Sequence, residues 1–301
     1  MANDLCILTL EGFTSFYNKI NSLLFSYNGE NIIAALSNGQ INCWQVPSGV
    51  FSWKIKAHRK SVNALAITPD EKNLVSASES GIIKLWDLSA KTKIMKFRGG
   101  LGSVKLLTIS PDGKTLVSSS SYSVKLWDIS NGELLRVFKE ENDISCIAIS
   151  SEGTFISSGL SSGFIRIWNY SNGEILQTIR AHEGPVYNLK FSPNGNHLVS
   201  SSYDGTIKIW NILSGQNEHK FIGPRRVKYS ITLSLDGKYL ISGSNEGTIK
   251  ILEVSTGNLI DTLEGHRSSV EIVSISPDGS YLLSSSNDRN IKLWDFLKVI
   301  S

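Results

Sequence analysis

The feature that most constrains this chain is a short phrase that recurs at a nearly fixed interval. Residues 202–211 read SYDGTIKIWN, and close variants appear as ESGIIKLWD at 79–87, SSGFIRIWN at 161–169, SNEGTIKILE at 244–253 and SNDRNIKLWD at 286–295. Successive aligned positions are 41 or 42 residues apart, at Trp44, Trp86, Trp127, Trp168, Trp210, Leu252 and Trp294. A constant period in the low forties over the whole chain predicts an array of similar units and excludes two unrelated domains.

Each period contains four short apolar runs separated by turn residues. In the fifth period these runs cover 185–191, 197–201, 206–210 and a last stretch that ends at Ile222. In the third run Ile207 and Ile209 face one side and Trp210 the other, so neither side can be left in water. Each four-stranded sheet must therefore lie between two neighbours, which seven sheets achieve only in a closed ring.

The residues at the repeated position resemble the WD40 repeat family. Trp-Asp stands at 86/87, 127/128 and 294/295, Trp-Asn at 168/169 and 210/211, and Gly-His or Ala-His precedes the next Trp at 265/266, 57/58 and 181/182. The resemblance implies an all-β fold in which residues 1–301 form a single seven-bladed WD40 β-propeller with four-stranded antiparallel blades. It also implies that residues 4–13 supply the outer strand of blade seven and close the ring, because CILTLEGF at 6–13 matches LIDTLEGH at 259–266.

The resemblance further implies a His, Ser, Asp and Trp hydrogen-bond network inside each blade. A buried indole N–H needs an acceptor, and a serine hydroxyl can accept it while donating to an imidazole held by a carboxylate. We expect complete networks in blades five and seven and a partial one in blade two, from His182, Ser200, Asp204 and Trp210, from His266, Ser284, Asp288 and Trp294, and from His58, Ser76 and Trp86.

Elsewhere the network is degraded. Ser80 replaces the Asp of blade two, Gly100 the His of blade three and Ser162 the Asp of blade four, while blade six offers Pro224, Glu246 and Leu252. The serines have neither a nucleophile elbow nor oxyanion donors, so the Ser-His-Asp sets predict structure and argue against hydrolysis.

Composition excludes several other classes of protein. The net charge of +3 comes from 30 basic and 27 acidic residues. This charge is too close to zero to indicate binding to nucleic acid or to an anionic membrane. Cys6, Cys43 and Cys146 are odd in number and lack metal-ligand spacing, so we expect no metal site and no disulfide framework. The N-terminus has no signal-peptide pattern and no apolar run is long enough to span a membrane. We expect an intracellular, cytoplasmic protein, with the nucleus left open.

Function is expected in the loops around one mouth of the central channel. In the WD40 family these loops precede the first strand of each blade and join its second and third strands. Tyr and Arg are enriched at interface hot spots, so we predict a protein-binding face from the Tyr, Arg and polar residues that align there. The candidates are Tyr187, Tyr203, Tyr229, Arg225, Arg226, Arg267, Arg289, Arg59, Lys105, Asn63 and Glu271.

Full coverage by repeats favours a non-catalytic interaction scaffold inside a larger complex, with protein partners and no cofactor or small-molecule substrate. The partner is a peptide segment or domain, and an acidic segment suits the arginines. Two alternatives stay open. One is a nucleic-acid binder that uses the basic residues of blades six, seven and two, and the other is an enzyme built around the central channel.

Overall fold

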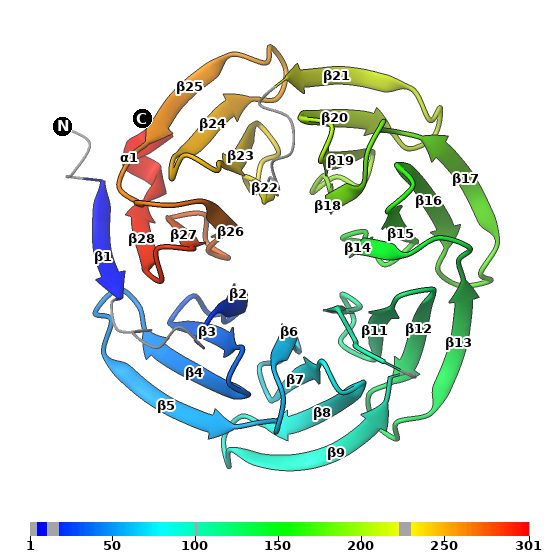
Figure 1. Ribbon diagram of the computed structural model, residues 1–301, viewed down its shortest axis with the longest axis vertical. Coiled ribbons are helices and arrows are strands. Elements are labelled where there is room, and N and C mark those ends of the chain that lie inside the picture. Colours follow the sequence, from blue (N-terminus) through cyan, green and yellow to red (C-terminus); the bar gives the residue numbers. More distant parts are fainter. Residues whose placement is uncertain (1–4, 11–17, 100–101, 223–229, 301) are drawn as a thin grey trace.

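The computed structural model describes residues 5–10, 18–99, 102–222 and 230–300, which form seven four-stranded antiparallel sheets arranged around a central opening (Figure 1). Blade one is β2 to β5, blade two β6 to β9, blade three β10 to β13, blade four β14 to β17, blade five β18 to β21 and blade six β22 to β25. Blade seven combines β26 to β28 with β1 from the start of the chain. The seven-bladed all-β fold predicted from the repeat is confirmed.

The strands follow one pattern in every blade. The innermost strands are β2 (Ile20–Phe25), β6 (Val62–Ile67), β10 (Leu106–Ile109), β14 (Ile144–Ile149), β18 (Val186–Phe191), β22 (Ile231–Leu233) and β26 (Val270–Ile275). The second strands are β3 (Asn31–Leu36), β7 (Asn73–Ser78), β11 (Thr115–Ser120), β15 (Phe155–Leu160), β19 (His197–Ser202), β23 (Tyr239–Gly243) and β27 (Tyr281–Ser286).

The third strands carry the repeated phrase and the outer strands form the rim. The third strands are β4 (Gln40–Gln45), β8 (Ile82–Asp87), β12 (Ser123–Asp128), β16 (Phe164–Asn169), β20 (Thr206–Asn211), β24 (Ile249–Glu253) and β28 (Ile291–Asp295). The outer strands are β5 (Phe51–Lys56), β9 (Thr92–Arg98), β13 (Leu134–Lys139), β17 (Ile175–Arg180), β21 (Asn217–Ile222), β25 (Leu259–Leu263) and β1 (Cys6–Leu10).

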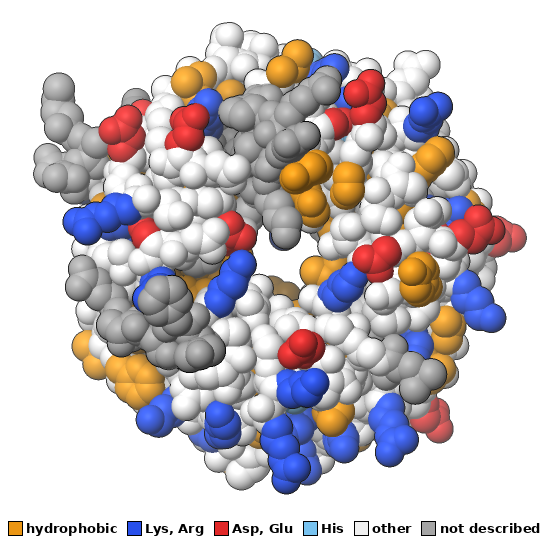
Figure 2. Space-filling view, in the orientation of Figure 1, with side chains coloured by type: hydrophobic (Ala, Val, Ile, Leu, Met, Phe, Trp, Pro, Cys, Tyr) orange, Lys and Arg blue, Asp and Glu red, His pale blue; other side chains and the backbone are white. Residues whose placement is uncertain are grey.

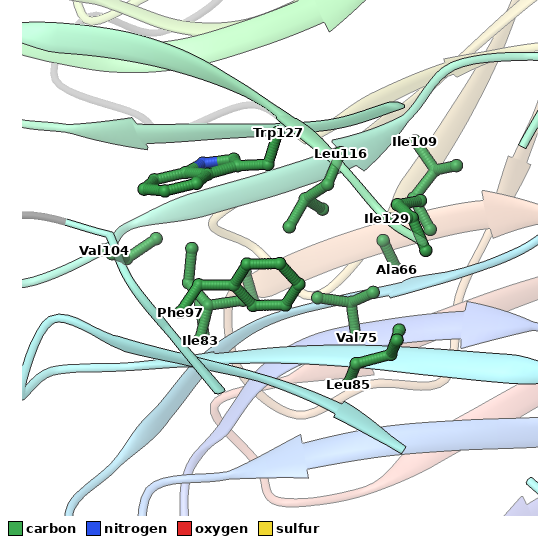
Figure 3. Close-up of a cluster of buried hydrophobic side chains, with 12 residues drawn as sticks. Ala66, Val75, Ile83, Leu85, Phe97, Val104, Ile109, Leu116, Trp127 and Ile129 are labelled. Atoms are coloured by element: carbon green, nitrogen blue, oxygen red, sulfur yellow. The ribbon is translucent and has the colours of Figure 1, made fainter. Parts of the chain in front are cut away.

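The tryptophans of the repeated phrase pack between neighbouring blades, so each blade needs its own copy of the phrase. In β8 both Leu85 on one face and Trp86 on the other are buried. Between blades two and three, Phe97 of β9 lies edge-on to Trp127 of β12 with ring centroids 5.9 Å apart (Figure 3). Each outer strand thus packs against the third strand of the next blade, on an indole in six blades and on Leu252 in blade six. The core is a series of such interfaces around the ring.

Blade seven closes the ring with strands from both ends of the described chain. β1 pairs antiparallel with β28, and Leu10 lies opposite Ile291. The predicted closing strand is therefore confirmed over Cys6–Leu10, whereas residue 4 and residues 11–13 of the prediction lie outside the described residues. The short helix α1 (Phe296–Ile300) was not predicted. It follows β28 and buries Phe296 and Val299 in the core of blades six and seven.

Candidate interaction face

The complete networks predicted for blades five and seven are present. In blade five the Trp210 indole donates to Ser200 Oγ at 2.8 Å, Ser200 Oγ lies 2.7 Å from His182 Nε2, and His182 Nδ1 lies 3.0 Å from Asp204 Oδ2. Burial lowers the pKa of His182 to about 4, against the opposing charge of Asp204, so its imidazole is neutral at pH 7. Ser200 therefore donates to Nε2, and the proton on Nδ1 points at the carboxylate.

Blade seven repeats this geometry with a second histidine. His266 lies 2.8 Å from Ser284 Oγ through Nε2 and 2.9 Å from Asp288 Oδ2 through Nδ1, and the Trp294 indole donates to Ser284 at 2.9 Å. Burial also lowers the pKa of His266.

The aspartates of these networks also fix the loops that reach the channel mouth. Asp204 accepts from the backbone N–H groups of Glu183 at 3.1 Å and Thr206 at 2.8 Å. It thereby joins the loop before β18 to the turn that carries Tyr203. Asp288 does the same in blade seven, where it accepts from the N–H groups of Arg267 at 2.8 Å and Asn290 at 2.9 Å. The two complete networks therefore hold rigid the loops that carry the Tyr and Arg candidates.

Blades two and four depart from the full network in different ways. In blade two His58 Nε2 lies 2.7 Å from Ser76 Oγ and the Trp86 indole donates to the same oxygen at 2.9 Å, as predicted, while Ser80 bonds Ser78. Burial lowers the pKa of His58 to about 4.

In blade four the sequence analysis overlooked Glu140, which stands where other blades have His. Its side chain is fully buried, accepts from Ser158 Oγ at 2.7 Å, and forms an ion pair with Arg166 at 2.7 Å. Burial raises the pKa of Glu140, while Ser158 and Arg166 lower it. The spacing of 28 residues before Trp168 could have revealed this position.

A girdle of polar contacts joins neighbouring blades at the mouth of the channel. Asn21 of β2 donates to Val62 O at 2.8 Å, and Asn63 of β6 donates to Val104 O at 3.0 Å. The next contact is an ion pair of 2.7 Å between Lys105 and Asp143. Between blades seven and one, Glu271 lies 3.7 Å from Lys19. The candidates Asn63, Lys105 and Glu271 are thus engaged in contacts between blades.

An aromatic pair occupies the same level in blade five. Tyr187 takes the strand position held by Asn21, Asn63 and Lys105 in blades one to three. Its ring lies 5.8 Å from that of Tyr203 at an interplanar angle of 82°, and Tyr203 is 38% exposed. Figure 2 shows hydrophobic side chains beside the opening over β18 and β19, in agreement with this pair. The mouth therefore changes from polar contacts to an aromatic surface at blade five.

Arg289 is the unusual residue of blade seven. The turn between the second and third strands has glycine at the corresponding position of most other blades, with positive φ at Gly39, Gly81, Gly163, Gly205 and Gly247. At Gly163 a Cβ atom would lie only 2.2 Å from the His182 carbonyl oxygen. Arg289 nevertheless adopts φ 71°. A positive φ is uncommon for a side chain of this size and is a reason to look for a function.

The described candidates form two groups on one face. Tyr187 and Tyr203 belong to blade five, and Arg267 and Arg289 to blade seven. Arg289, Glu271 and Lys19 line a small polar pocket of about 180 Å³. Arg59 lies apart on blade two. The candidates Tyr229, Arg225 and Arg226 fall outside the described residues.

The cysteines, the metal-ligating side chains and the helices of the described residues bear on metal binding and on membranes. Cys6, Cys43 and Cys146 are free thiols, and burial raises the pKa of Cys43 to about 12. Among the residues described, no three metal-ligating side chains lie together. No helix in those same residues has the length and apolar character needed to cross a bilayer.

Comparisons with known proteins agree with the fold. The family model described as "IFT122 first beta-propeller" matches residues 19–221, which is more than half of the chain. The repeat model described as "WD domain, G-beta repeat" matches residues 215–252 and 257–295. The curated proteins gave no match.

Proposed function

The chain belongs to the family described as the IFT122 first beta-propeller, and from that premise we propose that it is a non-catalytic scaffold that binds protein partners through the face bearing Tyr187 and Tyr203. WD40 propellers generally mediate protein–protein interactions, and the described residues form seven blades of this kind. The proposal places the protein in the cytoplasm, as a part of a larger complex. Its three free thiols suit a reducing compartment.

One observation carries the proposal, namely the aromatic pair at the channel mouth. Tyr187 and Tyr203 meet edge to face on elements that Asp204 ties together, so little conformational entropy remains to be lost when a partner covers them. Tyrosine is enriched at interface hot spots because its side chain combines a large apolar ring with a hydroxyl group. Tyr187 places an aromatic ring at the strand position where blades one to three have Asn21, Asn63 and Lys105.

Blade seven suggests what else the partner carries. Arg267 is exposed on this face, and Arg289 has a positive φ at a position where most other blades have glycine. Guanidinium groups bind carboxylates with paired hydrogen bonds. A peptide segment that presents an apolar group to blade five and carboxylates to blade seven fits this arrangement.

The experiment is affinity capture from the source cells with mass spectrometry. The variant is the double change Tyr187→Ala, Tyr203→Ala. Its matched control is Tyr27→Ala, because Tyr27 is 49% exposed and lies in the turn between β2 and β3, at the opposite face. We expect the double variant to lose the main partner and the control to keep it. Retention by a folded double variant would place the binding surface elsewhere.

A further inference from the structure

Charge is distributed unevenly around the ring. Residues 20–139, which span blades one to three, contain 15 basic and 8 acidic residues, a net charge of +7. The rest of the chain contains 15 basic and 19 acidic residues, a net charge of −4. Although the net charge of the whole chain is small, blades one to three form a basic side of the ring.

The basic side is concentrated on the outer strands of blades one and two. We define the basic arc as Lys54, Lys56, Arg59, Lys93, Lys96 and Arg98, all of them exposed. They come from β5, from the loop after it and from β9, and Figure 2 shows Lys and Arg side chains gathered along the lower rim, where Figure 1 places these strands. β5 and β9 contain no Asp or Glu. By contrast β17, β21 and β25 together hold two basic and two acidic residues.

The cations of the arc are not neutralised within the described residues. No ion pair there joins any of the six to a carboxylate, whereas Lys105, Lys238 and Lys298 have such partners. Lys96 of β9 lies directly opposite Lys84 of β8, a destabilising relation of like charges that Lys220 and Lys208 of blade five also have. Burial, then Lys93, Lys96 and Arg59, lower the pKa of Lys84, which shows that these charges act on one another.

Protection of a sheet edge does not explain the arc. Lysines on an outer strand prevent edge-to-edge aggregation. All seven outer strands have that need, yet β25 has no basic residue and β17 has one. The excess lies on three successive outer strands, β5, β9 and β13, which hold seven basic and no acidic residues. Like charges gathered on one side of the ring repel one another, and such a local conflict is expected where a surface is kept for binding.

We propose that the basic arc is a second binding surface, which takes a flexible, Asp- and Glu-rich segment of a protein partner. It is distinct from the face bearing Tyr187 and Tyr203. β5 and β9 follow the convex outside of the ring (Figure 1), and a flexible chain can follow that curve, whereas a flat bilayer touches it only along a line.

The side chains favour a polypeptide over a single-stranded nucleic acid. Single strands are bound largely by stacking of bases on exposed aromatic rings. Around the arc Trp44 and Trp86 are buried, and the ring of Trp53 is covered by the Lys91 ammonium at 5.1 Å. Phe51 at the start of β5 is 50% exposed, so β5 presents one exposed ring and no row of rings on which successive bases could stack.

The test is fluorescence anisotropy with a labelled oligoglutamate of about a dozen residues, titrated at low salt and again at about 0.2 M salt, where exposed charges are largely screened. The arc variant changes Lys54, Lys56, Lys93 and Lys96 to Glu. A charge-matched control changes Arg180, Lys220, Lys238 and Lys250 to Glu, all exposed on blades four to six. A second arc variant has Gln at the same four positions, so that the positive charge is removed without adding negative charge. Melting curves of all variants show whether each one is folded.

We expect the probe to bind the wild type at low salt and to weaken in high salt. The Glu arc variant should lose affinity by at least about tenfold and the Gln variant by less, while the control should lose under about threefold. The Tyr187→Ala, Tyr203→Ala variant should bind the probe normally, which separates this surface from the proposed function. Equal losses in arc and control variants would overturn the proposal. So would tighter, arc-dependent binding of oligothymidylate or of phosphatidylserine vesicles than of oligoglutamate.

Discussion

Leu10 and Ile291 lie opposite each other in neighbouring strands of one sheet, although they are 281 residues apart in the chain. This pairing of β1 with β28 converts an open array of blades into a ring. Without it β28 would present an unpaired edge between blades seven and one.

Deletion of residues 1–13 should therefore open the ring. We expect aggregation or a large loss of stability, because the truncated chain exposes the edge of β28 and the apolar side chains that Leu10 covers. Size-exclusion chromatography and thermal melting measure the effect. A monomeric truncated protein with an unchanged Tm would show that β1 does not hold the ring closed.

The blade-five network should contribute to stability through His182. We expect His182→Ala to lower the free energy of unfolding by about 1 to 3 kcal/mol, because Ser200 and Asp204 lose a buried partner. The matched control is His197→Ala in the same blade, whose ring is one-third exposed and pairs with Glu218 at the surface. It should cost under about 0.5 kcal/mol. Equal shifts in urea denaturation would contradict the role assigned to the network.

The buried histidines predict a loss of stability in acid. Burial lowers the folded-state pKa of His182 and His58 to about 4, below the unfolded value of 6.5, so the unfolded chain binds more protons between these values. Their contribution is complete above about pH 6.5 and is lost as the pH falls towards 4, by at most about 3 kcal/mol for each histidine. The double variant His58→Gln, His182→Gln should show a shallower decline in urea denaturation over this range. An unchanged slope would contradict the prediction.

The Glu140–Arg166 pair in blade four should behave as a coupled unit. Glu140→His alone should destabilise the protein by about 2 to 4 kcal/mol, because Arg166 loses its buried carboxylate. Adding Arg166→Lys should recover part of that loss, since it restores the His and Lys that blade two has at His58 and Lys84. The double-mutant cycle gives the coupling energy. Additive effects would mean that the two residues act independently.

The regular part of the fold could be predicted because the same four-strand pattern recurs seven times along the chain. The strands of blade five agree with their predicted bounds to within one residue at most ends, since turn residues and period-two burial define both limits. The helix α1 was missed because FLKVI is too short to show a helical period. The spacing of 28 residues before Trp168 marks the position of Glu140, but its role as a buried carboxylate depends on Arg166, which lies on another strand.

The candidate face could be predicted only in part. Alignment placed Tyr187 and Tyr203 on the same face, but their edge-to-face contact depends on the turn that Asp204 holds. Alignment could not show that Asn63 bonds to Val104 and Lys105 to Asp143 in the next blade, because these contacts depend on how neighbouring blades are placed.

Hydrogen exchange followed by mass spectrometry, on the protein alone and with the captured partner, tests the central claim most directly. The account predicts slower exchange in the loop before β18 and in the turn at 202–206, with the opposite turns at 111–113, 151–153 and 277–279 unchanged. Slower exchange confined to those opposite turns, with 202–206 unaffected, would contradict it.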